Sequence, residues 1–361
     1  MRFLHIADCH LGCRQYGLRQ REEDFYAAFA DAADKAVENK VDAVVVAGDL
    51  FDSVKPTAEA VYIVKKIVSK LHDHKIPVYG IEGNHDLTGD GYWLDVCGIV
   101  PLTDVGGSLN EHIVGCASVA GLPYMRPDQL VQRLRDDADN GSKCDVLLLH
   151  AGFVEMGDSY TGELSVQSVL PMLQEMGVKY VALGHIHVPM EQVHGGIHFV
   201  QPGSTELKDV SETPHKHAML VEIDGSGNGV RQSPVPLKTR PVEHVTVMDE
   251  DDLHKLLEDK SGFTGKFAVV SVANTVPDGA KRIEEALKGS LFRLSVFDNT
   301  NGVQGTGYER DKAIPTLAAA ISEFFDFGSD QYRLVSQILA TPDNLRQIAE
   351  DYINSDAETK E

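Results

Sequence analysis

Five short apolar segments, each ending in a polar cluster, constrain the fold of this chain more than any other feature. The segments are rich in aliphatic and β-branched residues, as is typical of strands that are buried on both faces of a sheet. They cover residues 3–7, 41–47, 77–81, 146–149 and 180–183. Helical periodicity occurs between the first three, at residues 22–39 and 57–71. This alternation predicts an α/β fold whose chemistry lies beyond the carboxyl ends of its strands.

The polar clusters supply carboxylate, amide and imidazole groups. They are Asp8-Cys9-His10, Gly48-Asp49, Gly83-Asn84-His85-Asp86, His150 and Gly184-His185-Ile186-His187. Any one of them alone is more often a turn, a helix cap or a satisfied polar pair. Five of them at five strand ends together predict a metal site. Oxygen and imidazole ligands suit manganese, iron, zinc or cobalt, and this number of imidazoles argues against magnesium alone.

The spacing within the clusters indicates how the ligands could reach the ions. Asp8 and His10 are two residues apart, and side chains at that spacing point to the same face of a strand. His185 and His187 have the same relation. Asp49 follows a glycine at a strand end, where its two carboxylate oxygens can bridge two cations. Four glycines are expected to keep the backbone clear of ions and substrate: Gly12, Gly48, Gly83 and Gly184.

Charge and cysteine content narrow the class of protein. With 33 basic and 55 acidic side chains the formal charge is −22, which argues against binding nucleic acid with the whole surface. If DNA is the substrate, attraction must come from a local patch, from bound cations or from a partner. Five cysteines without a C-x-x-C pair indicate neither a disulfide framework nor a cysteine zinc site. No signal peptide and no membrane span are expected, so we expect a cytoplasmic protein, or a nuclear one if the host has a nucleus.

The composition changes near residues 234–241. The residues that follow, 245–297, have the pattern β-α-β-α-β, which predicts a small second domain. A polar, glycine-containing stretch at 299–307 is typical of a linker, and amphipathic helices are expected at 314–325 and 342–353. The expected domains are residues 1–238, 239–300 and 301–361.

The motifs resemble those of the calcineurin-like metallophosphoesterase superfamily. Within it, the chain is most similar to the meiotic-recombination-eleven (SbcD-type) nucleases of double-strand-break repair. The matching stretches are residues 8–12, 47–52, 81–86, 149–152, 184–187 and 201–206. The metal motifs are shared by the whole superfamily, whereas the subfamily assignment depends on residues 11–12, 48–52 and 202–206 and on the small domain after residue 240.

The resemblance implies a four-layer α-β-β-α metallophosphoesterase sandwich with a small α+β capping domain and C-terminal helices. It also implies two divalent ions, for which we expect manganese. One ion would be held by Asp8, His10, Asp49 and His187, and the other by Asp49, Asn84, His150 and His185. In such enzymes the ions lower the pKa of a water or hydroxide that attacks phosphorus, and they neutralise charge on the phosphoryl oxygens.

The resemblance further implies two residues in catalysis. His85 follows a metal ligand and is expected to project toward the substrate, where it could protonate the leaving 3′ oxygen or stabilise developing charge. Asp52 stands where some family members have a histidine, and it could hold His85 in its charged form or cap the next helix. Four residues in loops after the metal motifs either touch phosphates or are solvated: Arg14, Tyr16, Arg19 and Lys55.

Partners are implied in the same way. A homodimer would form through residues 57–71 and 92–100, with contacts from Tyr62, Trp93 and Val96. An SMC-like ATPase would be bound by the C-terminal helices, although these could instead pack on their own domain. The expected function is that of a two-metal DNA nuclease, with 3′–5′ exonuclease and single-strand endonuclease activity, in double-strand-break repair. Nothing in the residues themselves indicates the direction of digestion.

Two alternatives remain open. A small-molecule or cyclic-nucleotide phosphodiesterase of the same superfamily would use identical metal chemistry, but it needs neither a capping domain nor C-terminal helices. A degenerate scaffold would keep the fold without catalysis. Such proteins usually lose ligands, whereas this sequence retains every expected ligand position.

Overall fold

The computed structural model describes residues 1–102, 109, 111–157, 164–209, 212, 215–224, 229–258 and 260–297. The linker expected at 299–307 and the helices expected at 314–325 and 342–353 lie outside these residues. The chain divides into two compact units. Of the described residues, the first holds those within Met1–His244, Ser261–Val269 and Gly289–Arg293, and the second holds those within Val245–Lys260 and Val270–Lys288 together with residues 294–297.

Two six-stranded mixed sheets form the centre of the first unit. In order across the first sheet, the strands are β12 (Val230–Pro236), β11 (His217–Ile223), β1 (Arg2–Ile6), β2 (Ala43–Ala47), β3 (Val78–Ile81) and β4 (Val100–Pro101). In the second sheet they are β5 (His112–Val114), β6 (Ala117–Leu122), β7 (Val146–His150), β8 (Tyr180–Gly184), β10 (Ile197–Gln201) and β9 (Met190–His194). The strands β1 to β4 are parallel, as are β6, β7, β8 and β10, and the antiparallel strands lie toward the sheet edges.

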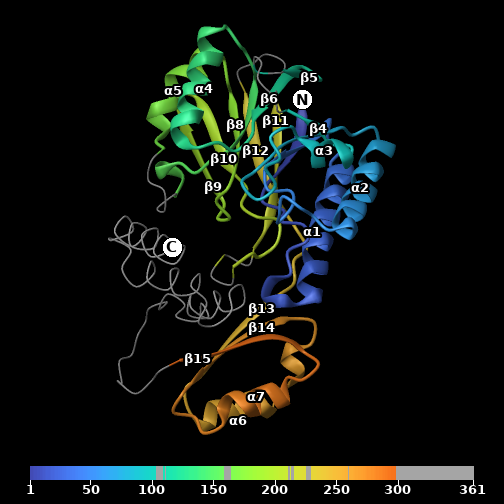
Figure 1. Cartoon of the computed structure of the whole chain (residues 1–361), viewed down its shortest axis with the longest axis vertical. Helices are drawn as coiled ribbons and strands as arrows, with labels where there is room; N and C mark the ends of the chain where they lie inside the picture. Colours follow the sequence, from blue (N-terminus) through green and yellow to red (C-terminus); the bar gives the residue numbers. More distant parts are fainter. Residues whose placement is uncertain are drawn as a thin grey trace, which may run out of the picture. The chain divides into compact units, whose positions relative to one another are not determined.

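Helices cover the outer face of each sheet. The helices α1 (Arg19–Glu38), α2 (Ala58–Asp73) and α3 (Tyr92–Val96) share a hydrophobic core with the first sheet, whereas α4 (Pro127–Asp139) and α5 (Val166–Glu175) share another with the second. Two short 3₁₀ helices, Gln15–Gly17 and Val154–Met156, follow β1 and β7. The expected α-β-β-α sandwich is therefore confirmed (Figure 1).

The continuous apolar runs of the sequence follow from burial of both sheet faces. Phe3 and Leu148 belong to the core between the two sheets. Their chain neighbours Leu4 and Leu147 pack outward, against the helix layers. Because successive side chains of a strand point to opposite faces, a strand that is covered on both sides must be apolar at every position.

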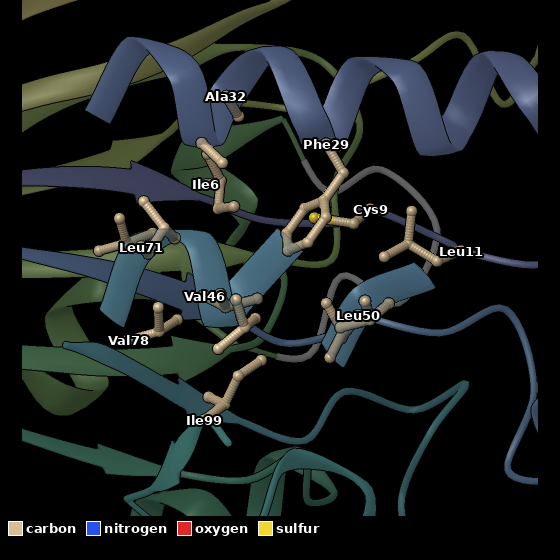
Figure 2. Packing of buried hydrophobic residues seen from close by; sticks show 14 of the residues in the cluster. Ile6, Cys9, Leu11, Phe29, Ala32, Val46, Leu50, Leu71, Val78 and Ile99 are labelled. Atoms are coloured by element: carbon tan, nitrogen blue, oxygen red, sulfur yellow. The ribbon is translucent and has the colours of Figure 1, made fainter. Parts of the chain in front are cut away.

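The outer core of the first sheet shows how helix and strand periodicities combine. Figure 2 shows Ile6 of β1 and Val46 of β2 packed with Phe29 and Ala32 of α1 and with Leu71 of α2. All five side chains are buried. Burying an aliphatic or phenyl side chain contributes about 1.5–3 kcal/mol, so this layer holds the loops at the strand ends on a rigid base.

Residues 242–297, which both units share, have a β-α-β-α-β pattern of the kind that the sequence predicts. Strands β13 (Val242–Val247), β14 (Phe267–Ala273) and β15 (Leu291–Phe297) form a sheet in that order. The connections hold α6 (Glu250–Glu258), the 3₁₀ helix Lys260–Phe263 and α7 (Gly279–Ala286). Both α-helices turn buried residues inward, namely Leu253, Leu256 and Ile283.

The proline-containing segment near residue 234 is a strand. Pro234 and Pro236 lie in β12, which forms one edge of the first sheet. Proline has no backbone N–H to donate, and a sheet tolerates it at an edge, where one side of the strand needs no partner. The change of composition in this region is therefore explained by an edge strand of the first sheet.

Among the described residues, no helix combines the length and the apolar character that crossing a bilayer requires.

His5 is the one histidine of β1, and it is completely buried. Its Nδ1 atom lies 3.0 Å from the Tyr180 hydroxyl, and its Nε2 atom lies 3.2 Å from the Leu183 carbonyl oxygen. Since a carbonyl only accepts, Nε2 carries the proton and Nδ1 accepts from the hydroxyl. Burial lowers the pKa of His5 to about 3, although the Leu183 carbonyl opposes the shift.

We predict that His5→Gln reduces the acid sensitivity of the fold. The ordinary histidine pKa is 6.5, and in the folded chain it is about 3, so the unfolded state alone takes up this proton between those values. The stability of the wild type therefore falls as the pH drops through this window. Between pH 7 and 5 the metal-free wild type should lose about 2 kcal/mol more free energy of unfolding than His5→Gln. Urea denaturation at both pH values measures this difference, and equal losses would contradict the prediction.

Candidate metal centre

The polar clusters of the sequence meet at one end of the two sheets. Asp8 and His10 follow β1, Asp49 follows β2 and Asn84 follows β3, all in the first sheet. In the second sheet His150 is the last residue of β7, and His185 and His187 follow β8. Parallel strands place their carboxyl ends at the same edge of a sheet, and the two sheets pack against each other through a shared core. Loops of the first and second sheets, such as those of His10 and His187, therefore make contact although they are 177 residues apart in sequence.

The first group of ligands consists of Asp8, His10 and His187. One ligand atom from each lies within 4.8 Å of the others. The Nε2 atoms of the two histidines are only 3.1 Å apart. The backbone N–H of His185 donates to both Asp8 carboxylate oxygens, at 2.9 and 3.1 Å, and so fixes that carboxylate.

The hydrogen-bond partners of His187 leave a lone pair facing His10. Nδ1 of His187 lies 2.9 Å from a Glu212 carboxylate oxygen, and Nδ1 of His10 lies 3.2 Å from one of Asp52. A carboxylate accepts hydrogen bonds and cannot donate them, so Nδ1 of His187 carries a proton and its Nε2 presents a lone pair toward His10. Nδ1 of His10 faces the Lys208 ammonium, 3.1 Å away, as well as the Asp52 carboxylate. The lone pair of His187 can therefore be satisfied by a proton on His10 Nε2 or by a cation.

The second group consists of Asp49, Asn84, His150 and His185. The Asn84 side-chain oxygen is 3.1 Å from His150 Nε2 and 3.0 Å from His185 Nδ1. His150 donates from Nδ1 to the Ala47 carbonyl oxygen at 2.8 Å, which leaves its Nε2 as the ligand atom. Asp49 connects the two groups, because its Oδ2 atom lies 3.4 Å from His150 Nε2 and 3.7 Å from His10 Nε2.

The pKa shifts in the second group show that it attracts positive charge. Burial disfavours the charged form of His150, but the Asp49 and Asp8 carboxylates outweigh it and raise the pKa of His150 to about 9. Burial alone would raise the pKa of Asp49, whereas His150 and His10 lower it well below its usual value. A proton on His150 therefore occupies the position of positive charge in the metal-free protein, and the donor set fits a divalent ion there.

Backbone strain marks the same residues. Four of the predicted ligands have positive φ angles: Asp8 at 52°, His10 at 45°, Asp49 at 49° and His185 at 102°. Non-glycine residues rarely adopt this region, and each such residue costs on the order of 1–3 kcal/mol. The strand β1 ends at Ile6, so the prediction that Asp8 and His10 share one face of an extended strand is wrong. They meet because the chain coils back in left-handed turns.

Glycines at the site make room for the ligands themselves. A Cβ atom on Gly48 would lie 2.2 Å from His150 Nδ1, and one on Gly83 would lie 2.1 Å from Asp49 Oδ1. On Gly184 it would lie 2.0 Å from the Ala47 carbonyl oxygen. These three glycines therefore allow close packing of protein groups at the strand ends, and the expectation that they also keep the backbone clear of ions and substrate stays a prediction. Gly12, whose Cβ would meet only Ala60 at 3.6 Å, instead serves a φ of 94°.

His85 lies beside the ligands without joining either group. Its backbone N–H donates to Asp49 Oδ1 at 2.8 Å, and its ring packs edge-on against His10 with centroids 4.8 Å apart. Nδ1 lies 3.2 Å from the Asp52 backbone carbonyl oxygen, to which it donates. The side chain is 39% exposed.

Asp52 is closer to His10 than to His85. Its Oδ1 atom is 3.2 Å from His10 Nδ1 and 3.9 Å from His85 Nδ1, and it also pairs with Lys208. Burial would raise the pKa of Asp52, but His10 and Lys208 lower it to about 2. Asp52 does not cap the next helix, because Thr57 is the N-cap of α2 and accepts from Ala60 N.

Of the four residues predicted to touch phosphates, the two arginines are paired with acidic side chains. Arg14 donates to Glu22 at 2.6 Å, and Arg19 bonds Glu22 and two further acidic side chains. Tyr16 is exposed, with a positive φ of 56°, and Lys55 is exposed. Contact of these four residues with DNA stays a prediction.

Several residues near the site were not predicted from the sequence. Lys208 lies 3.1 Å from His10 Nδ1 and pairs with Asp52. Glu212 bonds His187, and the charges of His187 and Lys216 help to lower its pKa to about 2 against the effect of burial. Tyr124 lies against His185 with ring centroids 5.9 Å apart. The sequence carried no signal for these residues, because contacts between side chains 25 or more residues apart leave no local pattern. The nearest motif recognised in the sequence was residues 202–206.

The fold and this centre define the class of protein. A family model described as "Calcineurin-like phosphoesterase" matches residues 1–189, and the chain belongs to this family. Membership implies a hydrolase with a divalent-metal centre, and the donor groups above fit such ions.

Individual relatives narrow the comparison. Proteins named "DNA double-strand break repair protein Mre11" are similar to this chain in several archaea. The one from Saccharolobus solfataricus is 28% identical over 94% of each chain. The one from Haloferax volcanii is 32% identical over 68% of this chain and 54% of that protein, and the one from Methanosarcina mazei is 47% identical over 66% and 39%. The chain thus spans about half or less of the length of the last two.

We predict that Gly184→Ala disrupts the centre. The added Cβ would collide with the Ala47 carbonyl and with His150 Nδ1, 2.9 Å away, and would displace the bond that orients His150. We expect a loss of about 1–3 kcal/mol of stability and of about tenfold or more in metal affinity, measured by thermal denaturation and calorimetric titration with Mn²⁺.

Gly177→Ala is the matched control. Its Cβ would meet no atom within 4 Å, but its φ of 76° makes alanine strained, so it should cost about 1 kcal/mol and leave metal affinity unchanged. Normal metal binding by Gly184→Ala would show that the close packing at this strand end is not needed.

Proposed function

We propose that this chain is a two-metal DNA nuclease that acts in double-strand-break repair. The observation that carries the proposal is the position of Asp49, whose Oδ2 atom faces ligands of both groups. A carboxylate shared by two sets of imidazole and oxygen ligands is the arrangement that a two-ion phosphoesterase requires. The similarity to Mre11 proteins, which extends over 94% of the chain in one case, supports DNA as the substrate.

The ligand sets follow the two groups. We assign one ion to Asp8, His10, Asp49 and His187, and the other to Asp49, Asn84, His150 and His185. Bound divalent ions, which we propose to be manganese, would activate a water and neutralise phosphate charge. Histidine and oxygen ligands without thiolate support manganese but also suit iron, zinc and cobalt.

His85 is the proposed catalytic acid. Its Nδ1–H is engaged by the Asp52 carbonyl oxygen, which leaves Nε2, on a side chain that is 39% exposed, as the ring nitrogen for a substrate. From there it can give a proton to the leaving 3′ oxygen or stabilise the charge that develops on it, a contribution of about 10²–10⁴-fold. Asp52 supports this role by holding His85 through its backbone and His10 through its carboxylate.

The acidity of the chain bears on how DNA is attracted. Arg14 and Arg19 are matched by carboxylates, so the bound ions supply the most concentrated positive charge at the site. We propose that an SMC-like ATPase provides further contacts, through residues 301–361, and that residues 239–300 form a cap over the nuclease domain, residues 1–238. The similarity to Mre11 proteins supports a repair assembly. The 3′–5′ exonuclease and single-strand endonuclease activities rest on the same resemblance.

We also propose a homodimer through α2 and α3. Tyr62 on α2 is 67% exposed and Tyr92 on α3 is 53% exposed. Trp93 is half-buried and donates to the Val54 carbonyl oxygen at 2.9 Å, while Val96 is half-buried. Large exposed aromatic side chains on adjacent helices are typical of interface cores.

A small-molecule or cyclic-nucleotide phosphodiesterase is the alternative. It would share the metal centre and differ only in substrate. Hydrolysis of bis-p-nitrophenyl phosphate without digestion of DNA would favour it.

We predict that His85→Ala strongly slows the nuclease reaction without releasing the metals. Wild-type protein with Mn²⁺ should remove nucleotides from the 3′ end of labelled double-stranded DNA, and the variant should be about 10²–10⁴-fold slower while still binding two ions. His74→Ala, which changes an exposed histidine on the loop after α2, is the control and should behave as wild type.

Two other results would redirect the proposal. Wild-type protein that holds two ions and cleaves bis-p-nitrophenyl phosphate but not DNA, even with its ATPase added, would support the small-molecule alternative. Full activity of His85→Ala would remove the catalytic role of that residue.

We predict that Tyr62→Asp converts a dimer into a monomer, because a charge would be buried unpaired in the interface. Light scattering on the eluate of a sizing column measures the mass. Ile113→Asp changes an equally exposed apolar side chain, 69% exposed on β5, and should remain dimeric. A monomeric wild type would contradict the proposed interface.

A further inference from the structure

A buried network lies behind His187 on the side away from the other ligands. Glu212 accepts from His187 Nδ1 through Oε1, at 2.9 Å. Its other oxygen, Oε2, accepts from Ser204 Oγ at 3.0 Å and from Lys216 Nζ at 2.5 Å. Lys216 also donates to Ser204 Oγ at 2.8 Å and to the His187 carbonyl oxygen at 3.3 Å. Ser204 and Lys216 are almost completely buried.

This network leaves Glu212 little freedom. Oε1 also accepts from the backbone N–H of Asp209 at 3.0 Å. A buried lysine and a buried carboxylate would each be costly alone, and the pair satisfies both. The carboxylate that meets His187 is therefore held in place by several donors on its two oxygens, and the imidazole ring is held with it.

His10, the other histidine predicted to bind the same ion as His187, also has a carboxylate beside its Nδ1 atom. His10 Nδ1 faces the Asp52 carboxylate at 3.2 Å, and Asp52 is paired with Lys208. In the other group, His150 donates to the backbone carbonyl of Ala47 instead. Each histidine of one site thus has a carboxylate beside its Nδ1 atom, and each carboxylate is paired with a lysine. In the other site, Nδ1 of His150 has a backbone carbonyl oxygen instead.

We propose that Glu212 is a positioning residue that strengthens ion binding at the site formed by Asp8, His10, Asp49 and His187, and not at the neighbouring site. The inference rests on the proposed two-ion function. A carboxylate behind a ligating histidine fixes the tautomer, orients Nε2 and increases the basicity of the imidazole. Glu212 does this for one ion only, since none of its described contacts involves Asn84, His150 or His185.

The test is calorimetric titration of the metal-free full chain with Mn²⁺. Glu212→Gln keeps the shape and an acceptor for Nδ1, and it should weaken one of the two ions by about tenfold. Glu212→Ala with Lys216→Met removes the carboxylate together with the lysine that would otherwise be left unpaired, and it should weaken that ion by up to about 100-fold. At a Mn²⁺ concentration that saturates the wild type, this double variant should hold one ion per chain.

Asp137→Asn is the matched control. Asp137 is a buried carboxylate on α4 that accepts from Arg133 at 2.8 Å and from Leu109 N at 3.3 Å, and none of the predicted ligands is among these partners. It should lower thermal stability without changing either ion. Thermal denaturation of each metal-free variant establishes that it is folded.

The outcomes separate this inference from the proposed function. Loss of one ion in the folded Glu212 variants, with the other retained, supports the inference. Unchanged affinities for both ions, or equal weakening of both, would overturn it while leaving the two-ion centre intact. A wild type that binds no manganese would overturn the centre itself.

Discussion

The carboxylate of Asp49 stands where two groups of ligands meet, and the geometry around it depends on positive charge at that point. Its Oδ2 atom lies within 3.7 Å of His10 Nε2 and 3.4 Å of His150 Nε2. In the metal-free chain the attraction raises the pKa of His150 to about 9, against the effect of burial. Metal ions can supply the same charge without a proton. The close approach of imidazoles and carboxylates at this point is thus stabilised when positive charge lies between them.

The sheets provide the rigidity that such a set requires. Asp8, His10, Asp49 and His185 hold strained left-handed backbone conformations, which persist only where surrounding structure determines them. The cores on both faces of each sheet fix the strand ends. Glycines at the same ends let side chains approach the backbone closely. The packed cores of the layers thus hold the ligands in their strained conformations.

The charge distribution separates two tasks. A formal charge of −22 would repel a polyanion, and the arginines near the site are paired with acidic side chains. Lys208 and Lys216, which contact His10 and His187, are paired with acidic side chains as well. On the proposed function, the ions themselves and a partner must therefore draw DNA to the site. Binding should then depend strongly on metal occupancy.

Much of the fold could be predicted from local patterns. The continuous apolar runs that became β1, β2, β3, β7 and β8 are recognisable because burial on both faces leaves no polar positions. The remaining strands of the two six-stranded sheets were not predicted. They lie mainly toward the sheet edges or beside turns, where a strand can be short, half-exposed or interrupted by proline, as β12 is at Pro234. Their pattern is then no stronger than that of a loop.

The sequence by itself determined which residue types end the strands, and from these the class of chemistry: seven oxygen and imidazole donors at strand ends and a histidine beside them. Only the tertiary structure decided how they meet. Left-handed turns, and not strand periodicity, bring Asp8 and His10 together, and Asp52 turns toward His10 instead of capping α2. Glu212, 25 residues beyond His187, has no local signal. Contacts between distant segments depend on how both sheets pack, and that packing is a property of the whole chain.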